Sequence, residues 1–148
     1  MLGIFLAIGV ASGTNGHSLE PAGVDILMLM DESGSMRKLD PDRFAEQAAQ
    51  LLADLSQLFN QEVRVAVVAY GEGAKVLLPF TPLDSAAPKL GSVLSKLDRN
   101  APITDIRSGL EVGYELLNSR SEKRKAFVVI ITDGALSEAD IPKGEDIY

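Results

Sequence analysis

The 148-residue sequence contains no cysteine, which excludes disulfide bonds and metal sites with thiolate ligands. It also lacks an excess of positive charge, since 14 Lys and Arg stand against 21 Asp and Glu and the net charge is −7. That balance opposes binding to polyanions, so nucleic acid is not an expected partner. A phosphate-binding loop of the form Gly-x-x-x-x-Gly-Lys-Ser/Thr is absent as well, so any nucleotide chemistry would belong to a partner protein.

The chain begins with an apolar run, residues 1–11, that is too short to cross a bilayer as a helix. The run is followed by small residues, as in a secretory signal, but it lacks the positively charged start of one. A signal, an upstream truncation and an apolar segment packed on the domain all remain open. We expect residues 1–21 to be a leader outside the fold and residues 22–148 to form one domain. The signal interpretation would make the protein secreted or extracytoplasmic; nothing else in the sequence indicates a compartment.

Four segments have the length and composition of strands. Residues 24–30 (VDILMLM) and 126–132 (AFVVIIT) are apolar runs, as in strands buried on both faces of a parallel sheet. Residues 63–70 and 75–80 are joined by a short glycine turn, so we expect them to pair antiparallel. A proline near the end of the latter places it at an edge. Strands that alternate with helices predict an α/β three-layer sandwich with a mostly parallel sheet.

Three helices are expected between these strands. Asp40 and Pro41 have the pattern of an N-cap and a first turn. They precede an apolar stripe at helical spacing that we expect to face the core, namely Phe44, Ala48, Leu51, Leu52, Leu55, Leu58 and Phe59. A second helix is marked by Leu90, Val93, Leu94 and Leu97, and a third opens at Thr104 and Asp105. The basic stretch at residues 120–125 is expected to be a solvated loop.

Both apolar runs lead directly to an aspartate, Asp31 and Asp133 respectively. Ligands of open α/β sheets bind beyond the carboxyl ends of the strands, at the point where the strand order reverses. The first crossover is expected to be right-handed and to lead to one side of the first strand. The strand that ends at Asp133 should therefore lie on the other side, which brings both aspartates to one crevice. The loop before the third helix enters from above, so Thr104 can reach the same point.

The loop after the first strand adds further oxygen donors. Ser33 and Ser35 alternate with Asp31, and alternate residues of an extended or gently turning loop face the same way. Together with Thr104 and Asp133 they form a set of three hydroxyls and two carboxylates, which suits Mg²⁺, Mn²⁺ or Ca²⁺ and disfavours Zn²⁺. Neutral hydroxyls leave such an ion electrophilic. If the aspartates act partly through water, one position of an octahedral ion stays free for an external carboxylate.

These residues resemble the metal-ion-dependent adhesion motif of von Willebrand factor type A domains, which is Asp-x-Ser-x-Ser, then a distant Thr, then a distant Asp. The match consists of Asp31, Ser33, Ser35, Thr104 and Asp133, within a likeness from residue 24 to about 141. It implies that the hydroxyls bind the metal directly, that the aspartates hold it through waters, and that a partner protein supplies a Glu or Asp ligand. The implied function is an adhesion or assembly module without catalysis. Family members usually continue with two more strands, so the chain is expected to be truncated after its fourth strand.

Other interpretations of the same residues remain. A magnesium-dependent phosphatase of the haloacid dehalogenase type also places an aspartate after its first strand, but it usually has a second Asp where this chain has Ser33. A scaffold subunit working beside an AAA+ ATPase is compatible with the same domain. Each motif alone fits an ordinary loop or helix cap with local hydrogen bonds. The joint occurrence of all five residue types, in order and at the ends of predicted elements, favours the metal site.

Overall fold

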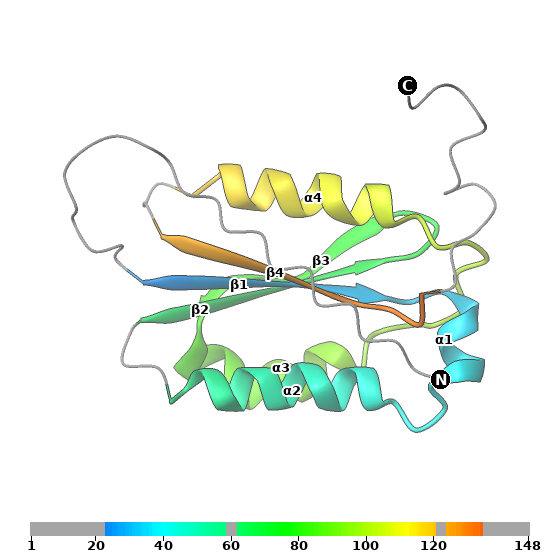
Figure 1. The fold of residues 1–148 in the computed structure, drawn as a ribbon, viewed down its shortest axis with the longest axis horizontal. Coiled ribbons are helices and arrows are strands. Elements are labelled where there is room, and N and C mark those ends of the chain that lie inside the picture. Colours follow the sequence, from blue (N-terminus) through cyan, green and yellow to red (C-terminus); the bar gives the residue numbers. More distant parts are fainter. Residues whose placement is uncertain (1–22, 59–61, 121–123, 135–148) are drawn as a thin grey trace.

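The computed structural model describes residues 23–58, 62–120 and 124–134. Its centre is a four-stranded sheet in the order β3-β2-β1-β4 (Figure 1). The strands are β1 (Val24–Asp31), β2 (Val63–Tyr70), β3 (Ala74–Pro82) and β4 (Lys125–Ile131). β1 pairs in parallel with β2 and β4, while β3 pairs antiparallel with β2. The predicted α/β fold with one antiparallel edge strand is confirmed. The predicted leader at residues 1–21 and the C-terminal part of the predicted domain, residues 135–148, lie outside the described residues.

Helices cover both faces of the sheet and produce three layers (Figure 1). α2 (Phe44–Ser56) and α3 (Leu83–Leu94) lie on one face, and α4 (Ile106–Asn118) lies on the other. Every residue of β1 is buried, because this strand lies in the middle of the sheet between two apolar clusters. Glycine lets α4 approach closely, since a Cβ at Gly113 would come within 2.8 Å of the Leu27 side chain.

The helix boundaries differ from the sequence-based expectation in three places. The loop expected after β1 contains a short helix, α1 (Gly34–Leu39). α2 begins at Phe44 rather than directly after Pro41, although the Asp40 carboxylate still accepts hydrogen bonds from the first two amides of α2. α3 begins at Leu83, well before the leucines that marked it, and includes a proline.

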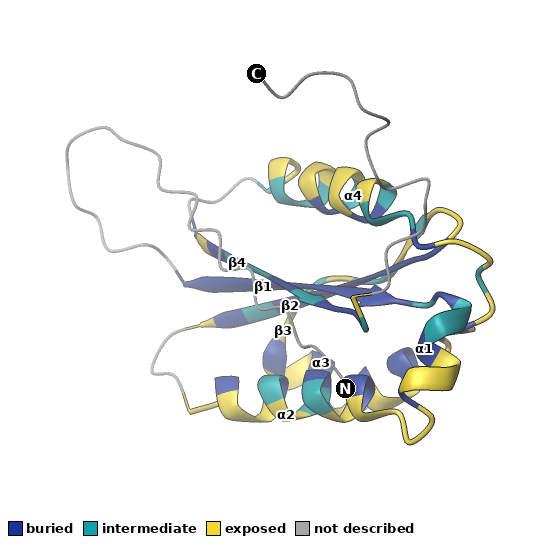
Figure 2. Ribbon diagram, turned by 45° about the vertical axis from the view of Figure 1, so that its right-hand side comes forward, coloured by how far each residue is buried: buried dark blue, intermediate teal, exposed yellow. Residues whose placement is uncertain are grey.

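The predicted inward face of α2 is wrong for most of its members, although Leu52 packs against the core as expected and Phe59 lies outside the described residues. The residues packed against the sheet are Ala45, Ala49 and Ala53, which allow the helix to lie close to the strands. Four members of the predicted stripe are instead 51–76% exposed, namely Phe44, Leu51, Leu55 and Leu58. Figure 2 shows this exposed surface along the outer side of α2. Helical spacing identified the stripe of larger apolar residues as the buried face. The face with the three alanines is buried instead, because small side chains fit the short distance between α2 and the sheet.

The expectation of a solvated basic loop at residues 120–125 is also wrong for Arg120 and Arg124, whereas Lys125 is exposed and begins β4. The fully buried Asp25 accepts hydrogen bonds from Arg64, Arg120 and Arg124 at 2.7–2.9 Å. Burial by itself would raise the pKa of Asp25, but the three hydrogen bonds and the charge of Arg64 outweigh it and hold the pKa below its ordinary value. This ion cluster connects β1 and β2 with Arg120, which follows α4, and with Arg124, which precedes β4. It lies at the end of the sheet opposite the predicted site.

Candidate metal centre

Asp31 is the last residue of β1 and is 1% exposed. Its Oδ1 accepts a hydrogen bond from the amide of Ser33 at 2.8 Å, and its Oδ2 accepts one from the Thr132 hydroxyl at 2.6 Å. Burial raises the pKa of Asp31, hydrogen bonds from Thr132 and Ser33 oppose the rise, and the charge of Asp133 adds to it. The carboxylate is therefore held in one orientation in a place where a nearby cation would stabilise its ionised form.

The two serines lie side by side, with their Oγ atoms 2.9 Å apart. Ser33 has an extended backbone (φ −65°, ψ 157°) and forms the N-cap of α1, whereas Ser35 already belongs to this helix. The convergence of the hydroxyls was predicted, but the expected cause was alternation along an extended loop. The structure produces it differently, because the chain turns into a helix directly after Ser33.

Thr104 comes from the loop before α4 and is buried. This loop is attached to the β1 end by backbone hydrogen bonds, from Gly34 to the carbonyl of Ala101 at 2.8 Å and from Ala101 to the carbonyl of Glu32 at 3.2 Å. As a result, Ser33, Ser35 and Thr104 line one pocket of about 380 Å³.

The next residue, Asp105, has a different role. Its carboxylate accepts hydrogen bonds from the amide and hydroxyl of Ser108, which lower its pKa and cap α4. Asp105 thus caps the N-terminus of α4 and is not one of the predicted metal ligands.

Asp133 follows β4 by two residues and is partly buried. Met30 of β1 pairs with Ile131 of β4, so the residues after these two strands emerge at the same edge of the sheet. The charge of Asp133 also contributes to the raised pKa of Asp31. Both predicted aspartates therefore follow neighbouring strands at one end of the sheet, the end at which the loop after β1 leads to Ser33 and Ser35.

The donor chemistry fits a hard cation. Two carboxylates that are close together and partly shielded from water repel each other, and a divalent cation between them would remove that repulsion. Within the described ranges, no group of three or more His, Cys, Asp or Glu side chains is placed to hold a metal. A metal at this point would therefore depend on the hydroxyls of Ser33, Ser35 and Thr104 as well as on the aspartates, which favours oxygen-preferring ions.

Sequence reasoning missed two residues that support this arrangement. Thr132 orients Asp31 and also accepts a hydrogen bond from the Gly134 amide at 3.0 Å. Its signal was its place at the end of an apolar run, directly before Asp133. Arg99 is buried with a left-handed backbone (φ 53°) and donates to the carbonyl and carboxylate of Asp40 at 2.6 and 2.8 Å. No local sequence pattern pointed to it.

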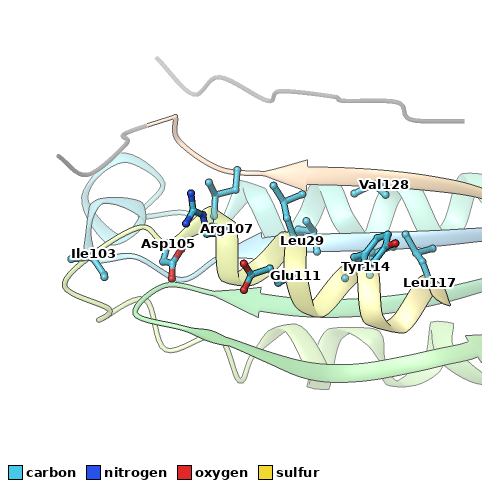
Figure 3. Close-up of a pocket in the computed structure, with 12 residues that line it drawn as sticks. Leu29, Ile103, Asp105, Arg107, Glu111, Tyr114, Leu117 and Val128 are labelled. Carbon is cyan, nitrogen blue, oxygen red and sulfur yellow. The ribbon is translucent and has the colours of Figure 1, made fainter. Parts of the chain in front are cut away.

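A larger cavity, of about 890 Å³, lies elsewhere, between α4 and strands β1 and β4. Figure 3 shows Leu29 and Val128 of the sheet on one side of it and Tyr114 and Leu117 of α4 on the other. None of the five predicted site residues lines this groove. The volume of a pocket therefore does not identify the site, because the three hydroxyl-bearing residues of the predicted set line the smaller pocket instead.

Comparisons with known proteins agree with the fold. The family model described as von Willebrand factor type A domain matches residues 26–135. Comparison with curated proteins finds no match. No helix among the described residues is long and apolar enough to span a membrane.

Solved structures provide three informative likenesses. The vWF domain of the type V pili tip protein Mfa5 from Porphyromonas gingivalis has a TM-score of 0.63 at 24% identity, covering 78% of this chain and 39% of that one. The PilB minor pilin from Streptococcus sanguinis has a TM-score of 0.61 at 20% identity, covering 79% and 31%. Proximal thread matrix protein 1 from the mussel byssus, with a zinc-occupied MIDAS motif, has a TM-score of 0.58 at 22% identity, covering 74% and 28%. The chain thus spans about a third of the length of these proteins.

Proposed function

The chain belongs to the von Willebrand factor type A domain family, and from that premise we propose that it is a divalent-cation-dependent protein-binding module and not an enzyme. Asp31, Ser33, Ser35, Thr104 and Asp133 are its proposed metal-binding residues. The observation that carries the proposal is that three hydroxyl-bearing residues line one pocket at the end of the sheet where the two aspartates follow β1 and β4. These residues come from three separate parts of the chain, and packing of the core alone does not require them to reach the same end of the sheet.

The proposed chemistry is the capture of an acidic side chain. A bound cation would supply a positive charge and an open coordination position at the pocket. Three of the five donors are neutral, so they would leave part of that charge available to an external carboxylate. The Asp31 carboxylate is already held at both oxygens by protein donors, which supports a role in orienting water around the ion rather than in enclosing it. We therefore propose a partner protein that presents Glu or Asp.

The proposed ion is Mg²⁺, with Mn²⁺ and Ca²⁺ as alternatives, because an all-oxygen donor set prefers these ions. The mussel byssus protein is described with zinc in its motif, so Zn²⁺ belongs in the same titration. Two similar structures are pilus proteins and a third is a thread matrix protein, which supports adhesion or assembly in an extracytoplasmic location as the proposed setting.

The phosphatase alternative is not favoured. Ser33 occupies the position where that mechanism needs a second aspartate as general acid, and its hydroxyl lies against Ser35. Within the described residues, the pocket that contains the two serines has no acidic side chain in its lining. Hydrolysis of an aryl phosphate at a rate that Asp31→Asn removes would contradict this conclusion.

The proposal is tested by calorimetric titration of the full chain with MgCl₂, MnCl₂, CaCl₂ and ZnCl₂. We expect Mg²⁺ or Mn²⁺ uptake, and we expect Asp31→Asn to lower the affinity by at least about tenfold. Asp84→Asn is the matched control, because Asp84 is exposed on α3 and loses the same charge. The absence of uptake of any of the four ions by the folded protein, or an equal loss in both variants, would contradict the proposal.

A further inference from the structure

We propose that the partner of this site presents two acidic groups, one for the metal and a second that binds Arg37 with help from Lys38. The inference rests on the proposed function and extends it from a single carboxylate to a diacidic segment. The geometry behind it is the lining of the pocket that contains Ser33, Ser35 and Thr104, because Arg37 and Lys38 line the same pocket.

The positive charges at this pocket are available to a partner. Arg37 and Lys38 are exposed on α1. The Nη1 of Arg37 donates to the Oδ1 of Asn100 at 2.8 Å, which holds the guanidinium toward the loop that leads to Thr104. Among the described residues, the other N–H groups of Arg37 and the ammonium of Lys38 have no partner. A guanidinium that is fixed at one nitrogen and open at the others is suited to a two-point contact with a carboxylate.

Most other cations of the domain are already paired with acidic groups. The paired set in the described part of the chain comprises Arg43, Arg64, Lys75, Arg99, Arg120 and Arg124. The chain as a whole has a net charge of −7. Two unpaired cations beside the proposed metal make the charge of this part of the surface opposite in sign to that of the whole chain. Such a reversal attracts an acidic partner and orients it as it approaches.

The opposite side of the same loop carries the opposite charge. Asn100, Ala101 and Pro102 line both the hydroxyl-bearing pocket and a second pocket of about 380 Å³. The second pocket is lined by three acidic side chains and one lysine, namely Glu32, Glu72, Asp98 and Lys75. The lysine is bound to Glu32 at 3.0 Å, so two acidic groups remain without a cation there.

This difference in charge between the two sides of the loop determines on which side of the metal a second acidic group of the partner can bind. A carboxylate next to the metal-bound one would be repelled on the side of Glu72 and Asp98 and attracted on the side of Arg37. Arg37 follows Ser35 by two residues of α1, which corresponds to an axial rise of about 3 Å. In an extended partner segment, residues two apart point the same way about 6.5–7 Å apart. A pair of acidic residues at positions i and i+2 is therefore the shortest extended segment that presents two carboxylates on the same side.

The experiment compares two blocked pentapeptides, Gly-Glu-Gly-Glu-Gly and Gly-Glu-Gly-Gln-Gly, which differ only in the second charge. Each is titrated into the full chain by NMR, once in Mg²⁺ or Mn²⁺ and once in EDTA. We expect the diacid to bind about fivefold tighter at low salt, which exceeds the roughly twofold statistical advantage of two equivalent acids. The ratio of the two affinities should shrink in 0.5 M NaCl, because the contact with Arg37 is exposed and screened.

The affinity ratio is also the readout for the variants. Arg37→Gln should bring it down to the statistical value, and Arg37→Lys should retain part of it because the charge remains while the two-point geometry is lost. Lys89→Gln is the matched control, since Lys89 is exposed on α3, does not line the pocket and loses the same charge. We expect it to leave the ratio as it is in the unaltered protein.

The outcomes separate the inference from the proposed function. Equal, metal-dependent binding of both peptides would overturn the inference and leave the proposed function standing. So would a ratio that Lys89→Gln lowers as much as Arg37→Gln, because the effect would then come from total charge. If neither peptide binds in Mg²⁺ or Mn²⁺, the proposed function fails and the inference fails with it.

Discussion

Arg99 connects the loop that leads to Thr104 with the end of the helix that contains Ser35. Its replacement should therefore weaken metal binding although Arg99 is not a proposed metal ligand. Its Nη1 donates to the Asp40 carbonyl directly after α1, and its Nη2 contacts the carboxylates of Asp40 and Glu46. Through these contacts Arg99 holds the loop that leads to Thr104 against the helix that contains Ser35. Its Nε has no hydrogen-bond partner among the described residues, so the terminal nitrogens provide the attachment.

The substitution Arg99→Lys keeps the positive charge but replaces the two terminal guanidinium nitrogens with a single ammonium nitrogen. A lysine nitrogen can replace Nη2 between the two carboxylates, but it cannot also reach the Asp40 carbonyl. Loss of that charge-assisted hydrogen bond should lower the free energy of unfolding by about 1.5–3 kcal/mol. Because Thr104 is then held less firmly, the affinity for Mg²⁺ or Mn²⁺ should fall about tenfold to hundredfold, the range typical of residues that orient metal ligands.

Arg124→Lys is the matched control for this prediction. Arg124 has a side-chain exposure of 1%, against 7% for Arg99, and it is bound to Asp25 and the Glu62 carbonyl at the opposite end of the sheet. Urea unfolding should show a similar loss of stability for both variants, while calorimetry should show a change in metal affinity of less than about twofold for Arg124→Lys. Equal losses of affinity in the two variants, or an unchanged affinity in Arg99→Lys, would refute the role of Arg99.

Three further predictions concern other parts of the structure. Thr132→Val removes the hydroxyl that orients Asp31 and should weaken metal binding about tenfold or more, measured by calorimetry; an unchanged affinity would show that the Ser33 amide suffices. The pKa of Asp25 is lower in the folded than in the unfolded protein, so its stabilising contribution is complete above the ordinary value of 3.8 and should be lost as the pH falls below it; urea unfolding between pH 5 and pH 2 should show an acid-dependent loss that Asp25→Asn reduces. Ala49→Leu should cost about 1–3 kcal/mol because this alanine packs against the sheet, whereas Leu51→Gln on the exposed face should change the stability by less than about 0.5 kcal/mol; the reverse order in urea unfolding would contradict the assignment of the α2 faces.

The strands were predictable because their information is local. An apolar run of seven or eight residues that leads to a polar residue specifies a parallel strand with little help from its surroundings, and β1 and β4 follow this rule. Only β1 is central and buried throughout, because β4 lies at the edge of the described sheet and is partly buried. The position of Asp31 and Asp133 after neighbouring parallel strands, at the same end of the sheet, then follows from chain direction and the handedness of crossovers. The short turn between β2 and β3 likewise predicted their antiparallel pairing.

The orientation of α2 was not predictable in the same way. Both of its faces are apolar, one lined with alanine and the other with leucine and phenylalanine, and periodicity favours the more hydrophobic one. The choice depends on how much space separates the helix from the sheet. That distance depends on the side chains of β1 and β2 and on the neighbouring α3, which are remote in the sequence.

The sequence by itself determined the strands, the order in which the five proposed ligands occur, and the end of the sheet at which they lie, because each depends on a local pattern or on chain direction. Tertiary structure alone decided which face of α2 is buried, that Arg120 and Arg124 bind Asp25, and that Arg99 attaches the Thr104 loop to the end of α1. These features depend on distances between side chains that are far apart in the chain, and a hydrogen bond or ion pair contributes only when packing has brought its two partners within reach and away from water.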